Sequence, residues 1–411
     1  MLQYEEALAR ILATIPAPAS ECIRLADADG RIVAEQIVSP IDLPPFDNSA
    51  MDGYAVRASD VAPATRETPV RLHLIGRVAA GENFSAQVTS GTCVRLFTGS
   101  PLPAGADAVL MQEDTKVDAS APGEILALDA VKPWENVRFH GEDVKRGAAL
   151  TEKGDVLTAG RLALLAAGGC AAIAVSRRPI VGILATGSEL KEPGEPLAPG
   201  QIYESNRTSI AALIRKSGAI PRVYPLVTDV LEKTRLALSG AFKECNIVIS
   251  SGGVSVGEMD FVKQALANLG GDLQFWKVAI KPGRPFVFGR FPISNHQLST
   301  IDHKLFFGLP GNPVSALVTF VLLVRPAILR WQGAQNVALP SHSASLAEPL
   351  ENQGDRRHFM RVTIASDGEV YSAGVQASHI LSSFAAANGL VDVPAKTTLS
   401  SGTTVRVLCW D

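Results

Sequence analysis

Acidic residues follow three separate apolar runs in the middle of the chain, at Glu189, Asp229 and Asp260. Each run is typical of a buried strand and is followed by a helical pattern, so we expect a mostly parallel sheet with right-handed crossovers. Because ligands of such sheets bind outside the carboxyl ends of the strands, the three carboxylates should meet in one crevice. Carboxylates suit Mg²⁺, which keeps several waters and bridges substrate phosphates. The pattern predicts a magnesium site beside an anionic substrate.

The same acids also have a structural interpretation. Asp229 and Asp260 each precede a predicted helix, where an aspartate commonly caps free backbone N–H groups. Taken singly, each acid favours the structural role. Because all three fall at the same edge of the sheet, we predict that they serve a site, with capping as the alternative.

A glycine-rich loop, SSGGVSVG, follows the third apolar run at residues 250–257. Small residues let backbone N–H groups approach an oxyanion closely, and the N-terminus of the next helix favours negative charge. The loop is neither a Walker A loop nor a GxGxxG fingerprint, and glycines also make ordinary turns. Its position favours phosphate binding by Ser251, Gly252, Gly253 and Ser255.

A second loop, GLPGNPVS at residues 308–315, contains Pro310 and Asn312 and places Pro313 in the first turn of a helix. It is either a second ligand-binding loop or a rigid turn that orients a buried helix. This segment alone does not separate the two interpretations.

Basic residues cluster in the segment WKVAIKPGRP, which holds Lys277, Lys281 and Arg284. Along one strand, positions 277 and 281 would point to the same face, where two cations could hold an oxyanion. The alternative is a solvated strand face, which is the commoner environment of lysine.

Polar residues also gather in the first third of the chain. The loop at residues 44–56 contains Asp47, Asn48 and Asp52, which either close the loop through Asx turns or line a reaction site. Thr98 and Asp143 lie in two further polar turns, TGSP and GED. The residues by themselves leave the role of these turns undecided.

Several other kinds of chemistry find no support. The seven histidines show no metal-ligand spacing, no serine–histidine–acid signature stands out, and the five cysteines form no CxxC pair. A net charge of −3, from 38 basic and 41 acidic residues, argues against a nucleic-acid binder with a broad basic face. The N-terminus lacks a signal pattern, and the longest apolar run, residues 316–324, is too short for a membrane span. We expect a cytoplasmic enzyme that works by positioning and electrostatic stabilisation around a metal-bound phosphate.

A chain of 411 residues is too long for one ordinary hydrophobic core, and its hydrophobic patterns predict a multi-domain α/β plus β protein. Residues 44–143 form short alternating runs, typical of a β-rich domain. This domain looks inserted, because residues 157–170 return to a helical pattern that could pack on an opening helix at residues 4–15. Residues 177–330 alternate strand and helix, and short strands after residue 331 fit a small C-terminal β-barrel or sandwich.

Long motifs in the chain resemble the MoeA family, the molybdopterin molybdenumtransferases. The matching segments are PPFDNSAMDGYAV, RLFTGSPLPAGADAVLMQED, GEDV, GQIYESNR, SGGVSVGEMDF, WKVAIKPGRPF, GLPGNPVSALVTF and, more thinly, QASHILSSF. The resemblance implies insertion of molybdate into adenylylated molybdopterin, with Mg²⁺-dependent release of AMP, to give molybdenum cofactor. It also implies a homodimer and contact with the molybdopterin adenylyltransferase, while the charge balance and the short apolar runs predict no nucleic acid or membrane as partner.

The resemblance further implies a domain layout and a set of site residues. The layout is an elongated helical domain (1–43 and 144–176), an inserted β-rich domain (44–143), an α/β domain (177–330) and a C-terminal β-barrel (331–411). The family's functional positions fall on Asp52, Thr98, Asp143, Glu189, Asp229, Asp260, Lys277, Lys281 and Ser378. The three sheet-edge acids would serve the metal and the phosphate, and the lysines would serve molybdate or the anionic groups of the pterin.

Two positions depart from the family pattern. Ser188 stands where the family often has an aspartate, and Arg284 stands where it often has a lysine. The first change weakens any claim that two adjacent acids share the metal, and the second keeps charge but not hydrogen-bond geometry.

The rival hypotheses are the adenylyltransferase of the same pathway and a scaffold or carrier that binds the cofactor without turnover.

Overall fold

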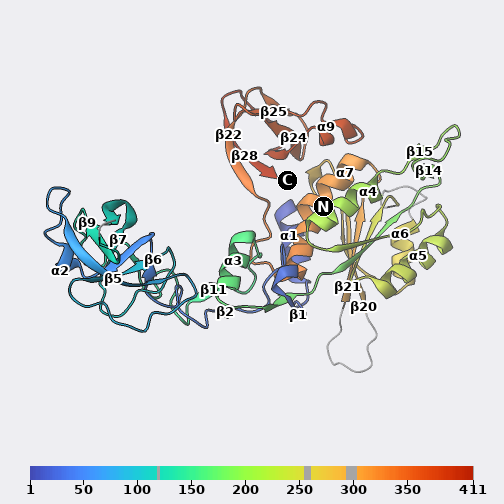
Figure 1. The fold of residues 1–411 in the computed structure, drawn as a ribbon. Helices are drawn as coiled ribbons and strands as arrows, with labels where there is room; N and C mark the ends of the chain where they lie inside the picture. Colours follow the sequence, from blue (N-terminus) through green and yellow to red (C-terminus); the bar gives the residue numbers. More distant parts are fainter. Residues whose placement is uncertain (118–120, 254–260, 293–302, 411) are drawn as a thin grey trace.

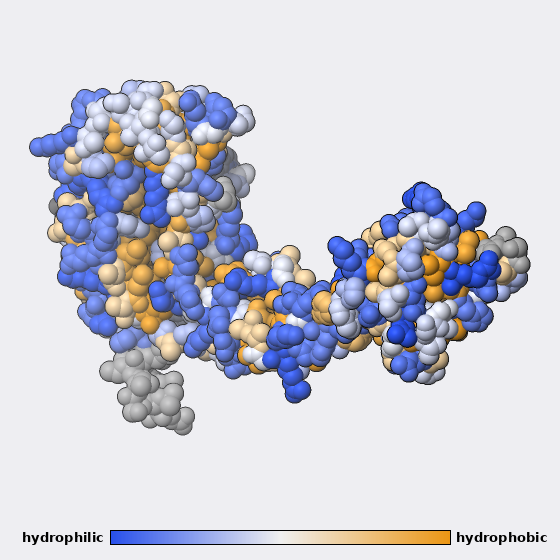
Figure 2. Space-filling view, turned by 90° about the vertical axis from the view of Figure 1, so that its left-hand side faces the viewer, coloured by the Kyte–Doolittle hydropathy of each residue, from blue (hydrophilic) through white to orange (hydrophobic). Residues whose placement is uncertain are grey.

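The computed structural model describes residues 1–117, 121–253, 261–292 and 303–410. A β-rich part lies at one end and is joined by a narrow waist of paired strands to a larger body (Figures 1 and 2). The larger body contains an α/β sheet with a second, C-terminal sheet packed beside it. The multi-domain α/β organisation expected from the sequence is therefore present.

The α/β sheet has six strands in the order β16-β13-β17-β21-β20-β18. Their bounds are β16 (Ile220–Val223), β13 (Ile180–Ala185), β17 (Ile247–Ser251), β21 (His303–Leu309), β20 (Val287–Pro292) and β18 (Asp272–Trp276). The first four strands are parallel, and β20 runs antiparallel to both of its neighbours. β17 is buried along its whole length, as expected of a strand covered on both faces. The carboxyl ends of β13, β17 and β21 therefore lie side by side at one edge.

Helices cover both faces of this sheet. One face carries α1 (Tyr4–Ala13), α4 (Asn206–Lys216) and the long helix Pro313–Trp331, whose buried side chains share one apolar cluster. The other face carries α5 (Leu231–Glu244) and α6 (Phe261–Asn268) in a second cluster. Val181 and Ile183 of β13 face the first cluster and Leu184 faces the second, so the strand's alternation divides its side chains between the two layers.

The long helix consists of α7 (Pro313–Thr319), a π-helical turn (Phe320–Val324) and α8 (Arg325–Trp331). Among the described residues it is the one helix long and apolar enough to cross a membrane, but 78% of its most apolar window is buried, as in a core helix. Pro326 has no N–H to donate to Leu322 four residues earlier. The Tyr4 hydroxyl of α1 lies 3.5 Å from that Leu322 carbonyl and donates to it instead.

One packing expectation is wrong. Helix α3 (Ala159–Ala167) does not share a core with α1: its Leu165 packs with Ile173 and Val175, whereas Ile11 of α1 packs against the long helix. Helical periodicity identifies the apolar face of a helix but not its partner. The long helix offers α1 a larger apolar surface than the short α3 does.

The waist consists of three pairs of antiparallel strands in which the outgoing chain runs beside the returning chain. The pairs are β1 (Ser20–Arg24) with β12 (Ala172–Ser176), β2 (Ile37–Val38) with β11 (Ala149–Thr151), and β3 (Asn48–Ser49) with β10 (Val137–Arg138). A 3₁₀ turn, Leu25–Asp27, follows β1. This pairing supports the interpretation that the β-rich part is inserted into the chain.

The β-rich part is a six-stranded sheet in the order β7-β4-β6-β5-β9-β8 with apolar clusters on both faces. Its elements are β4 (Gly53–Val56), α2 (Ala58–Val61), β5 (Val70–Val78), β6 (Thr92–Leu96), β7 (Ala108–Met111), a 3₁₀ turn (Gln112–Asp114), β8 (Thr115–Val117) and β9 (Glu124–Ala127).

The C-terminal sheet has the order β19-β24-β26-β28-β22, with β25 beside β24. Its elements are β22 (Ser341–Ser345), β24 (Arg357–Ile364), β25 (Val370–Ser372), α9 (Leu381–Ala385), β26 (Gly389–Val393) and β28 (Thr404–Cys409), with β23 (Leu350–Asn352) and β27 (Thr397–Leu399) as a separate pair. Strand β19 (Ile280–Lys281) comes from the α/β segment and pairs in parallel with β24. The basic segment therefore joins the two sheets.

Candidate functional site

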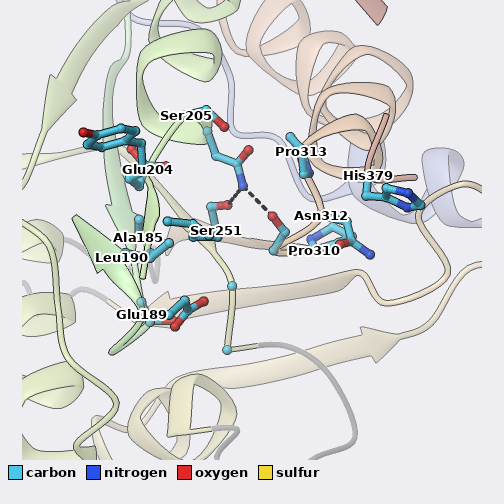
Figure 3. A pocket seen from close by; sticks show the side chains of 18 of the residues that line it. Ala185, Glu189, Leu190, Glu204, Ser205, Ser251, Pro310, Asn312, Pro313 and His379 are labelled. Carbon is cyan, nitrogen blue, oxygen red and sulfur yellow. Dashed lines mark hydrogen bonds between the residues drawn. The ribbon is translucent and has the colours of Figure 1, made fainter. Parts of the chain in front are cut away.

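A cavity of about 750 Å³ lies at the carboxyl edge of the α/β sheet, and we call it the strand-edge cavity (Figure 3). The loops after β13, β17 and β21 line it, together with the N-terminus of α4 and part of the C-terminal segment. Of the predicted site residues, it brings together Glu189, Asp229, Ser251, Gly252, Gly253, Pro310 and Asn312.

The two described acids of the predicted metal site belong to this cavity. Asp229 Oδ2 accepts a 3.1 Å hydrogen bond from the Ser188 N–H, and the Asp229 N–H donates to Ser188 Oγ over 3.2 Å. Helix α5 has Val230 at its N-cap, without a side-chain capping bond in the described structure. The capping alternative is therefore wrong for Asp229, whose carboxylate joins the loops after β13 and β16.

The third acid, Asp260, and Ser255 lie outside the described residues. Within the ranges that the structure describes, no three histidine, cysteine, aspartate or glutamate side chains come together as a metal site. Two carboxylates still fit Mg²⁺, which commonly takes one or two protein carboxylates and fills the rest of its octahedron with waters and phosphate oxygens. Glu189 and Asp229 are therefore the described residues that could hold it.

The glycines of the first loop are required by its backbone. Gly252 and Gly253 have φ values of +87° and +65°, in the left-handed region that other residues rarely adopt. A Cβ on Gly252 would lie 2.6 Å from the Thr186 carbonyl oxygen, and one on Gly253 would lie 2.8 Å from Thr186 Oγ1. The loop therefore packs its backbone directly on Thr186 at the cavity wall.

Asn206 connects the two glycine-rich loops, although it was not among the predicted site residues. Its Nδ2 donates to Ser251 Oγ over 2.7 Å and to the Gly311 carbonyl over 2.8 Å. Figure 3 draws these bonds as the two dashed lines that end at Ser251 and beside Pro310. The available signal was its place in GQIYESNR, one of the motifs that resemble the MoeA family.

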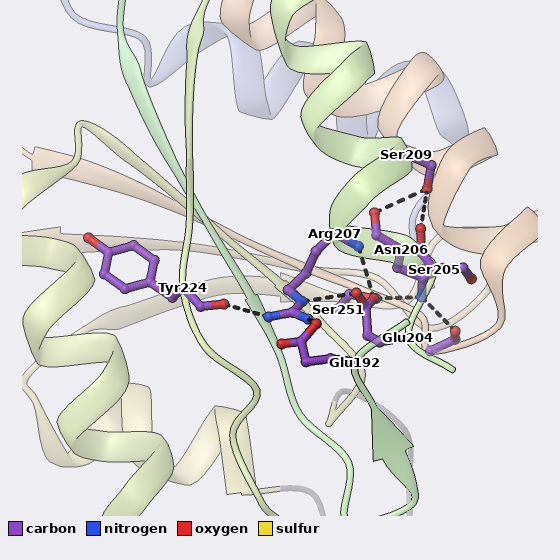
Figure 4. Close-up of polar contacts among 9 residues, drawn as sticks. Glu192, Glu204, Ser205, Asn206, Arg207, Ser209, Tyr224 and Ser251 are labelled. Atoms are coloured by element: carbon purple, nitrogen blue, oxygen red, sulfur yellow. Dashed lines mark hydrogen bonds and ion pairs between the residues drawn. The ribbon is translucent and has the colours of Figure 1, made fainter. Parts of the chain in front are cut away.

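A buried ion pair holds the start of α4 in place (Figure 4). Arg207 Nε donates to Glu204 over 2.9 Å, and the two side chains are only 6% and 3% exposed. The same guanidinium donates to the Tyr224 carbonyl over 2.7 Å and to Glu192 over 2.7 Å. These bonds tie the loop before α4 to the segment after β16, and they fix the position of Asn206.

A second cavity of about 650 Å³ adjoins the first, and we call it the basic cavity. Lys281, Arg284 and Arg356 line it, together with Ser378 and Gln376. Both cavities are also lined by Asn312 and His379. Asn312 Nδ2 donates to Ser378 Oγ over 3.3 Å, so the two cavities meet at this hydrogen bond.

The prediction that Lys277 and Lys281 share one strand face is wrong. β18 ends at Trp276, Lys277 has a φ of +73°, and Lys281 lies on β19 in the other sheet. The Lys277 Nζ lies 3.9 Å from the centre of the Trp276 ring. Strand alternation applies only within one continuous strand, and the sequence did not reveal the break between 276 and 280.

The remaining predicted residues lie in or next to the β-rich part. Thr98 donates to Asp52 Oδ1 from both its backbone N–H and its hydroxyl, each over 2.8 Å. The backbone bond, and then the side-chain bond, hold the pKa of Asp52 below its ordinary value. Asp47 accepts from the backbone N–H of distant His140 rather than closing a local Asx turn. Asp143 is exposed. The described residues that line the strand-edge cavity do not include Asp52, Thr98 or Asp143.

Comparison with known proteins gives matches along nearly the whole chain. Residues 2–169 match the MoeA N-terminal region (domain I and II), residues 182–330 a probable molybdopterin binding domain, and residues 343–410 the MoeA C-terminal region (domain IV). A molybdopterin molybdenumtransferase of Haemophilus influenzae is 39% identical, with 99% of this chain and 98% of that protein covered. The enzyme of the same name from Bacillus subtilis is 34% identical, with 99% and 94% covered. The crystal structure of the molybdopterin biosynthesis moeA protein from Pyrococcus horikoshii OT3 superposes with a TM-score of 0.83 at 33% identity, over 100% of both chains.

Proposed function

Since the chain belongs to the MoeA family, a family of transferases in molybdenum cofactor biosynthesis, we propose that it inserts molybdate into adenylylated molybdopterin, with Mg²⁺-dependent release of AMP. The observation that carries this proposal is that Glu189 and Asp229 line one cavity together with both glycine-rich loops. A carboxylate pair beside backbone N–H donors suits a phosphate that is bound together with a cation.

The strand-edge cavity is the proposed site of the pterin nucleotide. Glu189 and Asp229 would hold Mg²⁺, with Asp260 as the third predicted ligand. When bound, Mg²⁺ would neutralise charge on the phosphates whose cleavage releases AMP. Ser251, Gly252 and Gly253 place small side chains and backbone next to the phosphates, so that N–H groups can approach the oxygens.

The basic cavity is the proposed site of molybdate. Lys281, Arg284 and Arg356 supply positive charge there, and the Ser378 hydroxyl can donate to an oxyanion. Because Asn312 lines both cavities, an anion in the basic cavity would lie next to the pterin nucleotide. This arrangement brings the two substrates together without a covalent intermediate on the protein.

We also infer a homodimer. The predicted residues Asp52, Thr98 and Asp143 belong to a part of the chain that lies far from the strand-edge cavity of the same chain (Figure 1). If all of them serve one reaction, the β-rich part of a second copy must supply them. We further propose that Lys277, whose amino group lies over the Trp276 ring beside the same sheet edge, binds molybdate or the anionic groups of the pterin.

The remaining expectations rest on the sequence patterns and on the resemblance to the family. We propose the four domains given by residues 1–43 with 144–176, 44–143, 177–330 and 331–411. We expect the protein in the cytoplasm, where contact with the molybdopterin adenylyltransferase would deliver the adenylylated substrate.

The proposal is tested by incubating the purified chain with adenylylated molybdopterin, Mg²⁺ and molybdate and measuring AMP by chromatography. We expect AMP release to require molybdate and to be matched by active cofactor. AMP release that ignores molybdate would contradict the transferase assignment. Consumption of ATP with molybdopterin that is not adenylylated would favour the adenylyltransferase instead.

A further inference from the structure

Two buried polar atoms in the wall of the strand-edge cavity lack a hydrogen-bond partner. They are Asn206 Oδ1 and Thr186 Oγ1, and within the described part of the chain neither has a donor or acceptor in reach. The two residues are only 7% and 8% exposed. Buried polar groups are nearly always paired, because an unpaired one has lost its hydration without replacement. Thr186 and Asn206 both line the strand-edge cavity, so each is a candidate partner for a polar ligand there.

The orientation of the Asn206 amide is fixed by its surroundings. Nδ2 uses both of its hydrogens, on Ser251 Oγ and on the Gly311 carbonyl. Turning the amide over would present Oδ1 to the Gly311 carbonyl, which is itself only an acceptor. Nδ2 therefore lies where the two glycine-rich loops meet, and Oδ1 is held beside them as an unpaired acceptor within the described part of the chain.

The start of α4 is also too rigid for Asn206 to withdraw. The next residue, Arg207, makes the buried ion pair with Glu204 and the bond to Tyr224 described above. Gly252 lies within 3.7 Å of the Cβ position of Gly311, so the two loops touch next to Asn206. A fixed acceptor in a rigid wall selects ligands by their donors.

We propose that Asn206 is a specificity-determining residue whose Oδ1 accepts a hydrogen bond from an amine N–H on the heterocycle of the bound substrate. This proposal rests on the proposed function, which supplies two such heterocycles, the pterin and the adenine, each with one exocyclic amine. The Thr186 hydroxyl, which can both donate and accept, provides a second polar contact in the same wall. A ligand with a carbonyl oxygen in place of the amine would face Oδ1 with a second acceptor and be rejected.

The test uses two pairs of probes that differ only in this group. Pterin and lumazine differ by an amine or an oxygen at ring position 2, and AMP and IMP differ in the same way on the purine. Equilibrium binding of all four to the full chain is measured by calorimetry. We expect the amine probe of one pair to bind roughly 10- to 100-fold more tightly than its oxygen analogue, as for a buried acceptor left unpaired. The pair that shows this preference identifies the heterocycle.

Variants separate recognition from a structural role. Asn206→Ala should bring the affinity ratio of the preferred pair close to one. Asn336→Ala removes the same side chain at an exposed position outside the lining of both cavities and should leave the ratio unchanged. Thermal unfolding of each variant shows that the fold is kept.

Two results would overturn the inference. One is a wild-type chain that binds both pairs without preference, and the other is an Asn206→Ala variant that weakens both members of the preferred pair equally and so preserves their ratio. Normal molybdate-dependent AMP release alongside either result would leave the proposed function standing. A wild-type chain that binds none of the four probes and releases no AMP would contradict both.

Discussion

Asp229 and Ser188 hold each other through two hydrogen bonds, one from each backbone N–H to the side-chain oxygen of the other residue. The pair joins the loops after β13 and β16 beside Glu189. It also explains how the chain accommodates Ser188 where the MoeA family often has an aspartate, because the serine hydroxyl still accepts from the Asp229 N–H.

Restoring an aspartate at position 188 should make the site bind Mg²⁺ more tightly. Ser188→Asp places a third carboxylate beside Glu189 and Asp229, and like charges repel unless a cation lies between them. We expect the apparent Mg²⁺ affinity, from the Mg²⁺ dependence of AMP release, to rise severalfold. Ser188→Asn, which has the same shape without the charge, is the control. Equal Mg²⁺ affinities for the two variants would show that the added carboxylate does not reach the cation.

The ion pair of Glu204 and Arg207 should contribute far more to stability than its counterpart on α5. Both are glutamate–arginine pairs three residues apart, but Glu204 and Arg207 are 3% and 6% exposed, whereas Glu232 and Arg235 are 62% and 35% exposed. Glu204→Gln leaves the buried Arg207 guanidinium without its negatively charged partner and should lower the free energy of unfolding by about 3 kcal/mol. Glu232→Gln should change it by less than about 1 kcal/mol. Denaturant unfolding measures both, and equal losses would contradict this assignment.

Gly252 should tolerate a methyl group less well than another glycine of the same conformation. Gly252 and Gly270 have φ values of +87° and +79°, but a Cβ on Gly270 meets nothing within 4 Å, whereas one on Gly252 meets the Thr186 carbonyl. Gly270→Ala should therefore cost only the backbone strain, about 1 kcal/mol. Gly252→Ala adds the collision and should also weaken binding of AMP. Similar unfolding free energies for the two variants would mean that the loop moves away from Thr186 easily.

His358 should make the stability of the protein depend on pH. It is buried on β24 opposite Lys281, and burial, followed by the positive charges of Lys281, Arg361 and Arg356, lowers its pKa from 6.5 to about 3. Between these values the unfolded chain binds a proton that the folded chain does not, so stability falls as the pH falls below 6.5.

The size of this effect follows from the difference in proton binding. Lowering the pH from about 7 to about 5.5 should reduce the free energy of unfolding by about 1.2 kcal/mol through His358 alone. His358→Gln should remove that part of the pH dependence, and His342→Gln, at an exposed position, should keep it. A His358 variant with the wild-type pH dependence would contradict the assignment.

Local pattern was sufficient to predict the α/β sheet and the loops at its carboxyl edge. Apolar runs followed by helical patterns gave β13 and β17, and the topology of parallel strands then brought Glu189 and Asp229 to one cavity. The same reasoning failed for Lys277 and Lys281, because the break after Trp276 depends on pairing with two different sheets. Pairing partners are tertiary information that strand alternation does not contain.

Asn206 shows a second limit of sequence reasoning. An asparagine at the start of a helix is ordinarily interpreted as a cap, and no spacing rule links it to Ser251 or Gly311, which lie 45 and 105 residues away. Likewise, the apolar face of α1 was evident from periodicity, while its packing on the long helix was not.

The central claim is that Glu189 and Asp229 hold the cation on which AMP release depends. The most direct measurement is a Mg²⁺ titration of molybdate-dependent AMP release for the wild type and for Glu189→Gln, with Glu192→Gln, a neighbouring glutamate outside the lining of the strand-edge cavity, as control. Loss of a group that only hydrogen-bonds to a metal ligand already weakens metal binding about 10- to 100-fold. We expect Glu189→Gln to raise the Mg²⁺ concentration for half-maximal release by at least about tenfold, with the control unchanged. A Glu189→Gln variant with the Mg²⁺ dependence of the wild type would contradict it.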